Sequence, residues 1–197
     1  MSDQTKVFLF GHSFPARLLR RAREEGVEVS GLMNLNDHFD IFVEGHSGLT
    51  YDRIFSSIPH YFAKMRSKSI DILLLDLGTN DLCHVDNCAE VVVEQSLRFL
   101  SELKSNHIIP KRTIFLSVIK RSIITRPGQV TVSTFNHRVK DFNRRLSEQL
   151  DKLETVEMYS QRRVNNPKYL VDGCHLTADG MIKYCRGIRE AIYSCKL

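Results

Sequence analysis

The sequence has no long hydrophobic run, and this excludes several classes of protein. Its first apolar segment, residues 7–10, is far too short to cross a bilayer or to form the core of a secretory signal. We therefore expect a soluble, cytoplasmic protein or a domain excised from a longer one. No repeat, low-complexity tract or linker divides the 197 residues, so we expect one domain, residues 1–197, with a full hydrophobic core.

The cysteines are odd in number and irregularly spaced, which argues against a disulfide framework and favours a reducing compartment. Cys83, His84 and Cys88 lie close together in the chain, but the second pair of ligands that a zinc site needs is missing. We therefore expect neither a metal nor a cofactor. The five cysteines are Cys83, Cys88, Cys174, Cys185 and Cys195.

Acidic residues are outnumbered, because 23 Asp and Glu stand against 28 Lys and Arg, a formal net charge of +5. Arginines cluster in residues 17–23, 144–145 and 162–163. Solvated helix faces explain such clusters most simply. The alternative is a surface for nucleic acid or a membrane, although no zinc finger or RNP-like aromatic motif accompanies the clusters. Tryptophan is absent as well, and nothing in the sequence points to a long lipid tunnel.

Short apolar segments alternate with amphipathic ones along the chain. Residues 70–77 are too apolar for a strand with one solvated face, so they suit the centre of a parallel sheet. The alternation predicts an α/β fold, with a mostly parallel five-stranded sheet and helices on both faces. Five strands are predicted at residues 7–10, 27–32, 70–77, 113–119 and 155–159, and residues 39–43 are a further predicted strand that leads into a glycine-bearing loop. Helices are predicted at residues 16–25, 50–64, 88–105, 132–153 and 178–194, and a mobile flap at residues 120–129.

Residues 132–153 carry one apolar stripe at helical spacing, which we interpret as core packing: Phe135, Val139, Phe142, Leu146 and Leu150.

Polar or glycine residues follow three predicted strands at their carboxyl ends. Ser13 follows the first strand, Gly48 lies in a glycine-bearing loop after residues 39–43, and Asn80 follows residues 70–77. Ligands of an open parallel sheet gather beyond the carboxyl ends of its strands. We therefore expect these three residues to face one crevice.

The residue types match what a serine esterase requires. A serine hydroxyl is a poor nucleophile until a neighbouring base takes its proton, and His175 can do so if a carboxylate holds its other ring nitrogen. Asp172 lies three residues earlier, within local reach of that nitrogen. The backbone N–H groups of Ser13 and Gly48 and the Asn80 amide would form an oxyanion hole, in which each donor contributes roughly 3–4 kcal/mol.

Each of these residues has a simpler explanation when it is taken alone, but their order and placement favour the enzyme. His12 and His46, which lie beside them, are interpreted as structural polar groups rather than catalysts. The simpler explanations are a helix cap for Ser13, a loop cap for Asn80, a loop ion pair for Asp172 with His175, and turns for Gly45 and Gly48.

The first motif is not the nucleophile elbow of the α/β-hydrolases, because Gly-x-Ser-x-Gly is absent. Four blocks instead resemble the SGNH, or GDSL-type, hydrolase superfamily, in an order and spacing that span residue 6 to about residue 193. The resemblance implies a three-layer α/β/α sandwich of flavodoxin-like type, Ser13 as nucleophile, and Gly48 rather than Gly45 as oxyanion donor. The blocks are Gly11-His12-Ser13, Gly45-His46-Ser47-Gly48, Gly78-Thr79-Asn80-Asp81 and Asp172-Gly173-Cys174-His175.

One departure from the family pattern lies beside the nucleophile. His12 occupies the place of the usual aspartate, which is mainly a structural hydrogen-bonding group in the family. A weaker turnover or an altered pocket is therefore a consequence to test, whereas the fold is not in question. The Gly-His-Ser-Phe start, residues 142–146 and the closing Asp-Gly-x-His-Leu run resemble a metazoan branch that includes esterase domains of LINE-type retrotransposons.

These features predict a serine esterase that hydrolyses acetyl or short-chain esters of a sugar, a lipid or a small alcohol through an acyl-enzyme. A second hypothesis is a weak or inactive binding module of the same fold, whose basic face contacts nucleic acid or a membrane surface. A third is acyl transfer to an acceptor other than water, which the same residues would support. The sequence predicts no particular oligomeric state.

Overall fold

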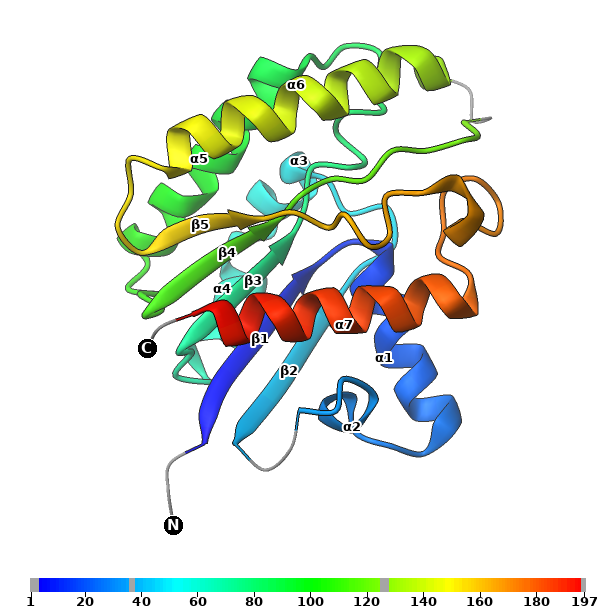
Figure 1. Ribbon diagram of the computed structural model, residues 1–197. Helices are drawn as coiled ribbons and strands as arrows, with labels where there is room; N and C mark the ends of the chain where they lie inside the picture. The colour runs from blue at the N-terminus through cyan, green and yellow to red at the C-terminus, as the bar shows by residue number, and fades with distance from the viewer. Residues whose placement is uncertain (1–3, 36–37, 125–127, 196–197) are drawn as a thin grey trace.

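The computed structural model describes residues 4–35, 38–124 and 128–195, which fold around a five-stranded parallel sheet (Figure 1). The strands lie in the order β2-β1-β3-β4-β5, and every neighbouring pair is parallel. This is the order of flavodoxin-like doubly wound sheets, so the predicted α/β class is confirmed. The strands are β1 (Thr5–Gly11), β2 (Phe39–Gly45), β3 (Ile72–Asp76), β4 (Arg112–Leu116) and β5 (Val156–Tyr159).

Helices cover both faces of the sheet and complete the three layers (Figure 1). α1, α2 and α7 pack on one face, and α3 to α6 pack on the other. Within the described ranges, no helix is both long and apolar enough to cross a membrane. The helices are α1 (Ser13–Glu25), α2 (Val29–Leu32), α3 (Tyr51–Phe55), α4 (Ile58–Arg66), α5 (Ala89–Ser105), α6 (Val132–Leu150), α7 (Ala178–Ser194) and the short 3-10 helix η1 (Pro167–Tyr169).

The central strand divides the hydrophobic core in two. On β3, Leu73 and Leu75 pack toward α5 and α6, whereas Ile72 and Leu74 pack toward α1 and α7. Every residue of β3 is buried, as expected for a parallel strand with helices on both sides.

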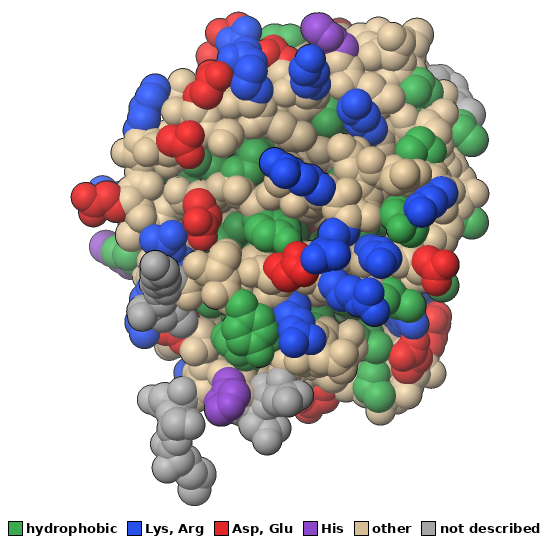
Figure 2. Space-filling view, in the orientation of Figure 1, with side chains coloured by type: hydrophobic (Ala, Val, Ile, Leu, Met, Phe, Trp, Pro, Cys, Tyr) green, Lys and Arg blue, Asp and Glu red, His purple; other side chains and the backbone are tan. Residues whose placement is uncertain are grey.

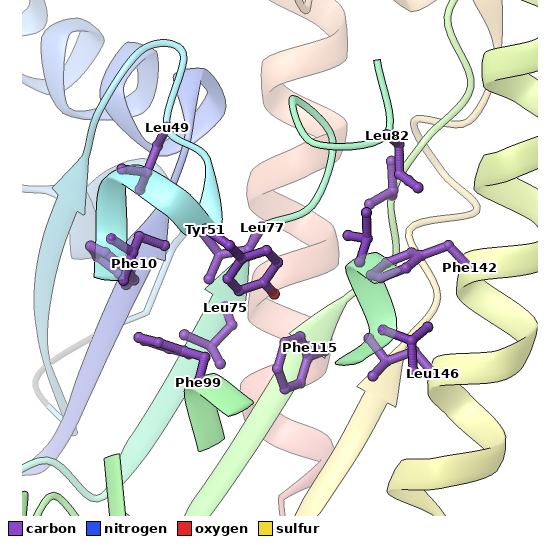
Figure 3. Packing of buried hydrophobic residues seen from close by; sticks show 14 of the residues in the cluster. Phe10, Leu49, Tyr51, Leu75, Leu77, Leu82, Phe99, Phe115, Phe142 and Leu146 are labelled. Atoms are coloured by element: carbon purple, nitrogen blue, oxygen red, sulfur yellow. The ribbon is translucent and has the colours of Figure 1, made fainter. Parts of the chain in front are cut away.

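The apolar stripe predicted for residues 132–153 is the buried face of α6, which ends at Leu150. All five residues of the stripe are at most 2% exposed. Figure 3 shows Phe142 and Leu146 in the same core as Phe115 of β4. The interpretation of this stripe as core packing is therefore confirmed.

The strand predicted at residues 27–32 is wrong, because the chain forms the short helix α2 there. Gly26 ends α1 in a left-handed conformation with φ of 66°, and Met33 N–H then bonds to Val29 O at 3.2 Å. Val29 packs under α1, whereas Val27 is 45% exposed. The backbone groups of this segment form local hydrogen bonds, and the Val29 side chain is buried against α1, so the segment does not join the sheet.

The single helix predicted at residues 50–64 is instead two helices, α3 and α4. Thr50 caps α3 as expected, since its Oγ1 accepts the Arg53 N–H at 3.4 Å. Pro59 lies in the first turn of α4, where its missing N–H costs no intrahelical hydrogen bond. A continuous helix would have required that bond, so the chain breaks between Phe55 and Ile58.

Candidate active site

The residues singled out in the sequence meet in one cleft at the carboxyl ends of the strands. The cleft has a volume of about 350 Å³. A hollow of similar volume, about 380 Å³, lies where β3 and β4 begin, at the opposite edge from the one where parallel sheets place ligands. The predicted residues that line the first cleft are Ser13, Gly48, Asn80, Asp172 and His175.

Ser13 is placed by a tight junction between β1 and α1. β1 ends at Gly11, where a Cβ atom would lie 2.5 Å from the backbone oxygen of Asp76 on β3, so only glycine fits there. Ser13 is the first residue of α1, and its backbone N–H therefore has no acceptor within the helix. The hydroxyl and a free N–H donor consequently lie side by side at the helix N-terminus.

Asp172 and His175 form a compact pair on the loop before α7. Asp172 Oδ2 lies 2.6 Å from His175 Nδ1, and Asp172 Oδ1 accepts the backbone N–H groups of Cys174 at 3.0 Å and His175 at 2.7 Å. Burial alone would raise the pKa of Asp172, but these hydrogen bonds outweigh it and hold that pKa well below its ordinary value. Asp172 is therefore ionised, and it leaves His175 Nε2 as the ring nitrogen available to another group.

Residues 120–124 hold this loop in place. Ser122 N–H bonds to Gly173 O at 3.0 Å, and a Cβ atom on Gly173 would lie 2.4 Å from Ile123. Of the predicted flap at residues 120–129, residues 125–127 lie outside the described residues. Ile123 and Ile124 line the cleft, so the segment supplies part of its wall.

The Ser13 hydroxyl faces a histidine other than the one that the sequence predicted. Among the hydrogen bonds of the described residues, Ser13 Oγ has His12 Nδ1 as partner, at 3.3 Å, and none joins it to His175. Hydrogen bonds between catalytic groups are often long or absent before substrate binds, so His175 stays a candidate base. His12 itself is 3% exposed, and its Nε2 lies 3.0 Å from Asp76 Oδ1.

The Asn80 side chain is held at both of its ends. Its Nδ2 donates to Leu49 O at 2.9 Å, and its Oδ1 accepts from Arg121 Nη2 at 3.5 Å. Arg121 is 9% exposed, and it also donates to the Cys83 sulfur at 2.8 Å. Burial raises the pKa of the Cys83 thiol to about 11, so Arg121 bonds to a neutral thiol.

Gly45 and Gly48 serve different structural purposes. A Cβ atom on Gly45 would lie 2.1 Å from the backbone nitrogen of Ala16, so Gly45 allows β2 to approach α1. Gly48 has φ of 71°, a left-handed conformation that favours glycine. Arg53 Nη1 donates to the carbonyls of Ser47 and Gly48 at 3.2 and 3.1 Å. In a trans peptide the N–H points opposite to the carbonyl, so the Gly48 N–H points away from the Ser47 oxygen that Arg53 binds. Gly45 is thus a packing glycine rather than a turn.

His46 pairs with Glu44, at 2.6 Å between Nε2 and Oε1. Cys83 is buried and Cys88 is exposed, and the described residues contain no group of three or more side chains that could hold a metal ion.

Three functional candidates escaped the sequence analysis. Asp76 bonds to His12, Tyr184 bonds to Asp76, and Arg121 bonds to Asn80. Asp76 could have been found, because it is a charged residue near the end of an otherwise apolar predicted strand. Nothing in the sequence marked Arg121 or Tyr184, because their partners lie far away along the chain.

Asp81 predicts a pH dependence of stability. It is 2% exposed, its Oδ1 accepts the Tyr51 N–H at 2.9 Å, and its Oδ2 has no partner. Burial raises its pKa from 3.8 to about 6, so between these pH values the folded protein keeps a proton that the unfolded chain has released. Stability therefore falls as the pH rises through this window, by up to about 3 kcal/mol.

Replacing Asp81 by asparagine removes this titration and keeps the acceptor for Tyr51. We expect the free energy of unfolding of Asp81→Asn, minus that of wild type, to be larger at pH 8 than at pH 4 by up to about 3 kcal/mol, because only wild type loses stability over this range. Urea denaturation at both pH values measures the difference. An equal difference at the two pH values would show that burial does not raise the pKa of Asp81.

Comparison with solved structures identifies the class of protein that has this architecture. The chain has the fold of the SGNH, or GDSL-type, hydrolases. A GDSL-like lipase from Bacteroides thetaiotaomicron is 19% identical with a TM-score of 0.69, over 96% of this chain and 88% of the lipase. A carbohydrate acetylesterase from Sinorhizobium meliloti is 16% identical with a TM-score of 0.71, over 97% of this chain and 99% of the esterase.

A carbohydrate esterase of family 3 from Talaromyces cellulolyticus is likewise 16% identical, with a TM-score of 0.67 over 97% of each chain. No protein-family model and no curated protein sequence matches the chain. At these identities the likeness establishes the fold. The placement in a retrotransposon branch stays a prediction.

Proposed function

We propose that the protein is a serine esterase that hydrolyses acetyl or other short-chain esters. The observation that carries the proposal is a single cleft that holds Ser13 together with His175, whose Nδ1 lies 2.6 Å from Asp172 Oδ2. A nucleophile, a base and an orienting carboxylate are the groups that acyl transfer by serine requires. The similarity in fold to lipases and acetylesterases supports the same class.

In the proposed reaction, Ser13 Oγ attacks the ester carbon while His175 Nε2 takes the serine proton. Asp172 holds the imidazole in the required tautomer and stabilises its charged form. The oxyanion that develops accepts hydrogen bonds from the N–H groups of Ser13 and Gly48 and from the Asn80 amide. His175 then protonates the departing alcohol, and a water that it activates releases the acyl group from Ser13.

The size and lining of the cleft favour small substrates. About 350 Å³ is near the lower limit of about 300 Å³ for small-molecule sites. Ile123 and Ile124 supply an apolar wall suited to an acetyl or short acyl chain. Two solved structures with this fold are named as carbohydrate esterases, so a sugar acetate is a natural first substrate to test.

Serine-directed labelling tests the proposal most directly. A fluorophosphonate should attach to about one serine per folded molecule, and mass spectrometry of the peptides should place the label on Ser13. Purified protein should also hydrolyse p-nitrophenyl acetate. Folded wild-type protein that takes no label and hydrolyses no short ester above the Ser13→Ala background would refute the esterase proposal.

Replacing Asn80 by alanine should lower kcat about 10²–10³-fold while KM changes little, because an oxyanion donor acts in the transition state. Steady-state kinetics with p-nitrophenyl acetate measure both constants. Asn87→Ala is the matched control, since Asn87 donates instead to Asp81 O, at 3.0 Å. A loss of the same size in both variants would mean that the segment is merely distorted.

The alternative of a binding module depends on the basic face. Figure 2 shows lysine and arginine side chains gathered on the face that carries α1 and α7. Several clustered arginines are ion-paired, however: Arg21 lies 2.6 Å from Glu25, and Arg163 pairs with Glu190. Binding of labelled RNA or anionic vesicles across a salt series, by protein that takes no fluorophosphonate label, would favour this alternative.

Acyl transfer uses the same residues, so product analysis separates it from hydrolysis. Added alcohols should leave acetate as the main product if water is the acceptor, whereas a transferase would form the new ester.

A further inference from the structure

Ser13 is in contact with a second histidine–aspartate pair, on the buried side of the cleft. His12 Nδ1 lies 3.3 Å from Ser13 Oγ, and His12 Nε2 lies 3.0 Å from Asp76 Oδ1. Tyr184 OH donates to Asp76 Oδ2 at 2.6 Å and completes the chain of contacts. His12, Asp76 and Tyr184 are each at most 3% exposed.

Three elements hold this chain of contacts in place. Asp76 is the last residue of β3 and is in register with Gly11 of β1, and the His12 N–H bonds to Asp76 O at 3.2 Å. Tyr184 reaches Asp76 from α7 on the other side. The Phe14 ring packs edge-on against the His12 ring, with centroids 4.9 Å apart. His12 therefore has little freedom to rotate.

The contacts also determine the tautomer of a neutral His12. A carboxylate only accepts hydrogen bonds, so Asp76 requires the ring proton on Nε2. The Nδ1 lone pair then faces the Ser13 hydroxyl, which can donate to it. This is the relationship that a serine nucleophile has with its general base.

We propose that His12 is a second general base for Ser13 and acts from the buried side, which rests on the proposed esterase function. Ser13 Oγ forms a bond to the acyl carbon as its proton moves to His12 Nδ1, and the bond from that carbon to the leaving oxygen breaks. His12 does not line the cleft, so it cannot protonate the leaving group. On this route the leaving oxygen departs as an anion. A leaving group that needs a proton depends on the route through His175, which lines the cleft, takes the serine proton on Nε2 and passes it to the leaving oxygen.

This division predicts a dependence on the leaving group. p-Nitrophenolate departs as an anion and needs no proton, whereas an ethoxide leaving group requires one. In His175→Ala, acylation by p-nitrophenyl acetate should therefore persist at least about tenfold above Ser13→Ala. Hydrolysis of ethyl acetate by the same variant should fall to the Ser13→Ala level. A base contributes about 10²–10⁴-fold, which sets the scale of the remaining rate.

The deciding experiment is the pre-steady-state release of p-nitrophenolate by wild type, His175→Ala, Ser13→Ala and the double variant His12→Asn/His175→Ala. The double variant should drop at least tenfold below His175→Ala and reach the Ser13→Ala level. Should the double variant fail to fold, Asp76→Asn/His175→Ala replaces it, because that change favours the other tautomer of His12 and keeps the size of the side chain. Thermal denaturation checks the folding of each variant.

Two results would overturn the proposal while the esterase function stands. One is a His175→Ala rate equal to that of Ser13→Ala beside an active wild type, and the other is a double variant no slower than His175→Ala. In either case His12 is a structural group. A wild type that shows no Ser13-dependent activity overturns both proposals.

Discussion

Replacing Ser13 by alanine is expected to reduce kcat for p-nitrophenyl acetate by about 10³-fold or more. The variant lacks the atom that forms the acyl-enzyme, while the helix N-terminus and the oxyanion donors stay in place. Because Ser13 and His175 act as a unit in the proposed reaction, the double variant Ser13→Ala/His175→Ala should be no slower than Ser13→Ala alone. Steady-state hydrolysis at equal enzyme concentration measures each rate.

Ser160→Ala provides the control for this loss. Ser160 follows β5 at the same edge of the sheet, is exposed and lies outside the cleft, so its replacement should change activity by less than about twofold. If Ser13→Ala keeps most of the wild-type activity, Ser13 is not the nucleophile. The hydrolysis would then need another group.

Replacing Gly45 by alanine is expected to destabilise the protein by about 3 kcal/mol or more. The new Cβ atom would lie 2.1 Å from Ala16 N and 2.6 Å from the backbone carbon of Pro15, and backbone atoms cannot move aside as a flexible side chain can. α1 must therefore shift away from β2. Urea denaturation followed by circular dichroism measures the free energy of unfolding.

Gly31→Ala is the matched control, because nothing lies within 4 Å of a Cβ atom at Gly31 in α2. Alanine there should leave stability unchanged or raise it by up to about 1 kcal/mol. Equal stabilities of Gly45→Ala and wild type would mean that β2 and α1 separate at little cost. Since α1 begins at Ser13, a folded Gly45→Ala protein should also lose esterase activity.

Local patterns predicted most of the secondary structure. α7 was predicted with both of its ends correct, because Thr177 caps it and its apolar residues recur at helical spacing. The apolar run at residues 70–77 identified the central strand. The short segments at residues 27–32 and 50–64 were harder, since a few apolar residues satisfy a strand pattern or a helix pattern equally well.

Local sequence patterns were enough to show which residue types are available for chemistry and which segments must be buried. The candidate catalytic residues lie in short blocks of sequence. Ser13 and Asn80 each follow a predicted strand, and Asp172 lies three residues before His175, so these neighbourhoods could be predicted from the local sequence. The alternation of strands and helices likewise left few folds to consider, because parallel strands require crossovers.

Which residues meet across the sheet became visible only in the packed structure. His12 lies beside Asp76 because β1 and β3 pair in parallel with Gly11 opposite Asp76. Tyr184 and Arg121 reach their partners from elements that are distant in the chain. Such contacts depend on strand register and helix packing, which arise from the whole core, and no local pattern of residues specifies them.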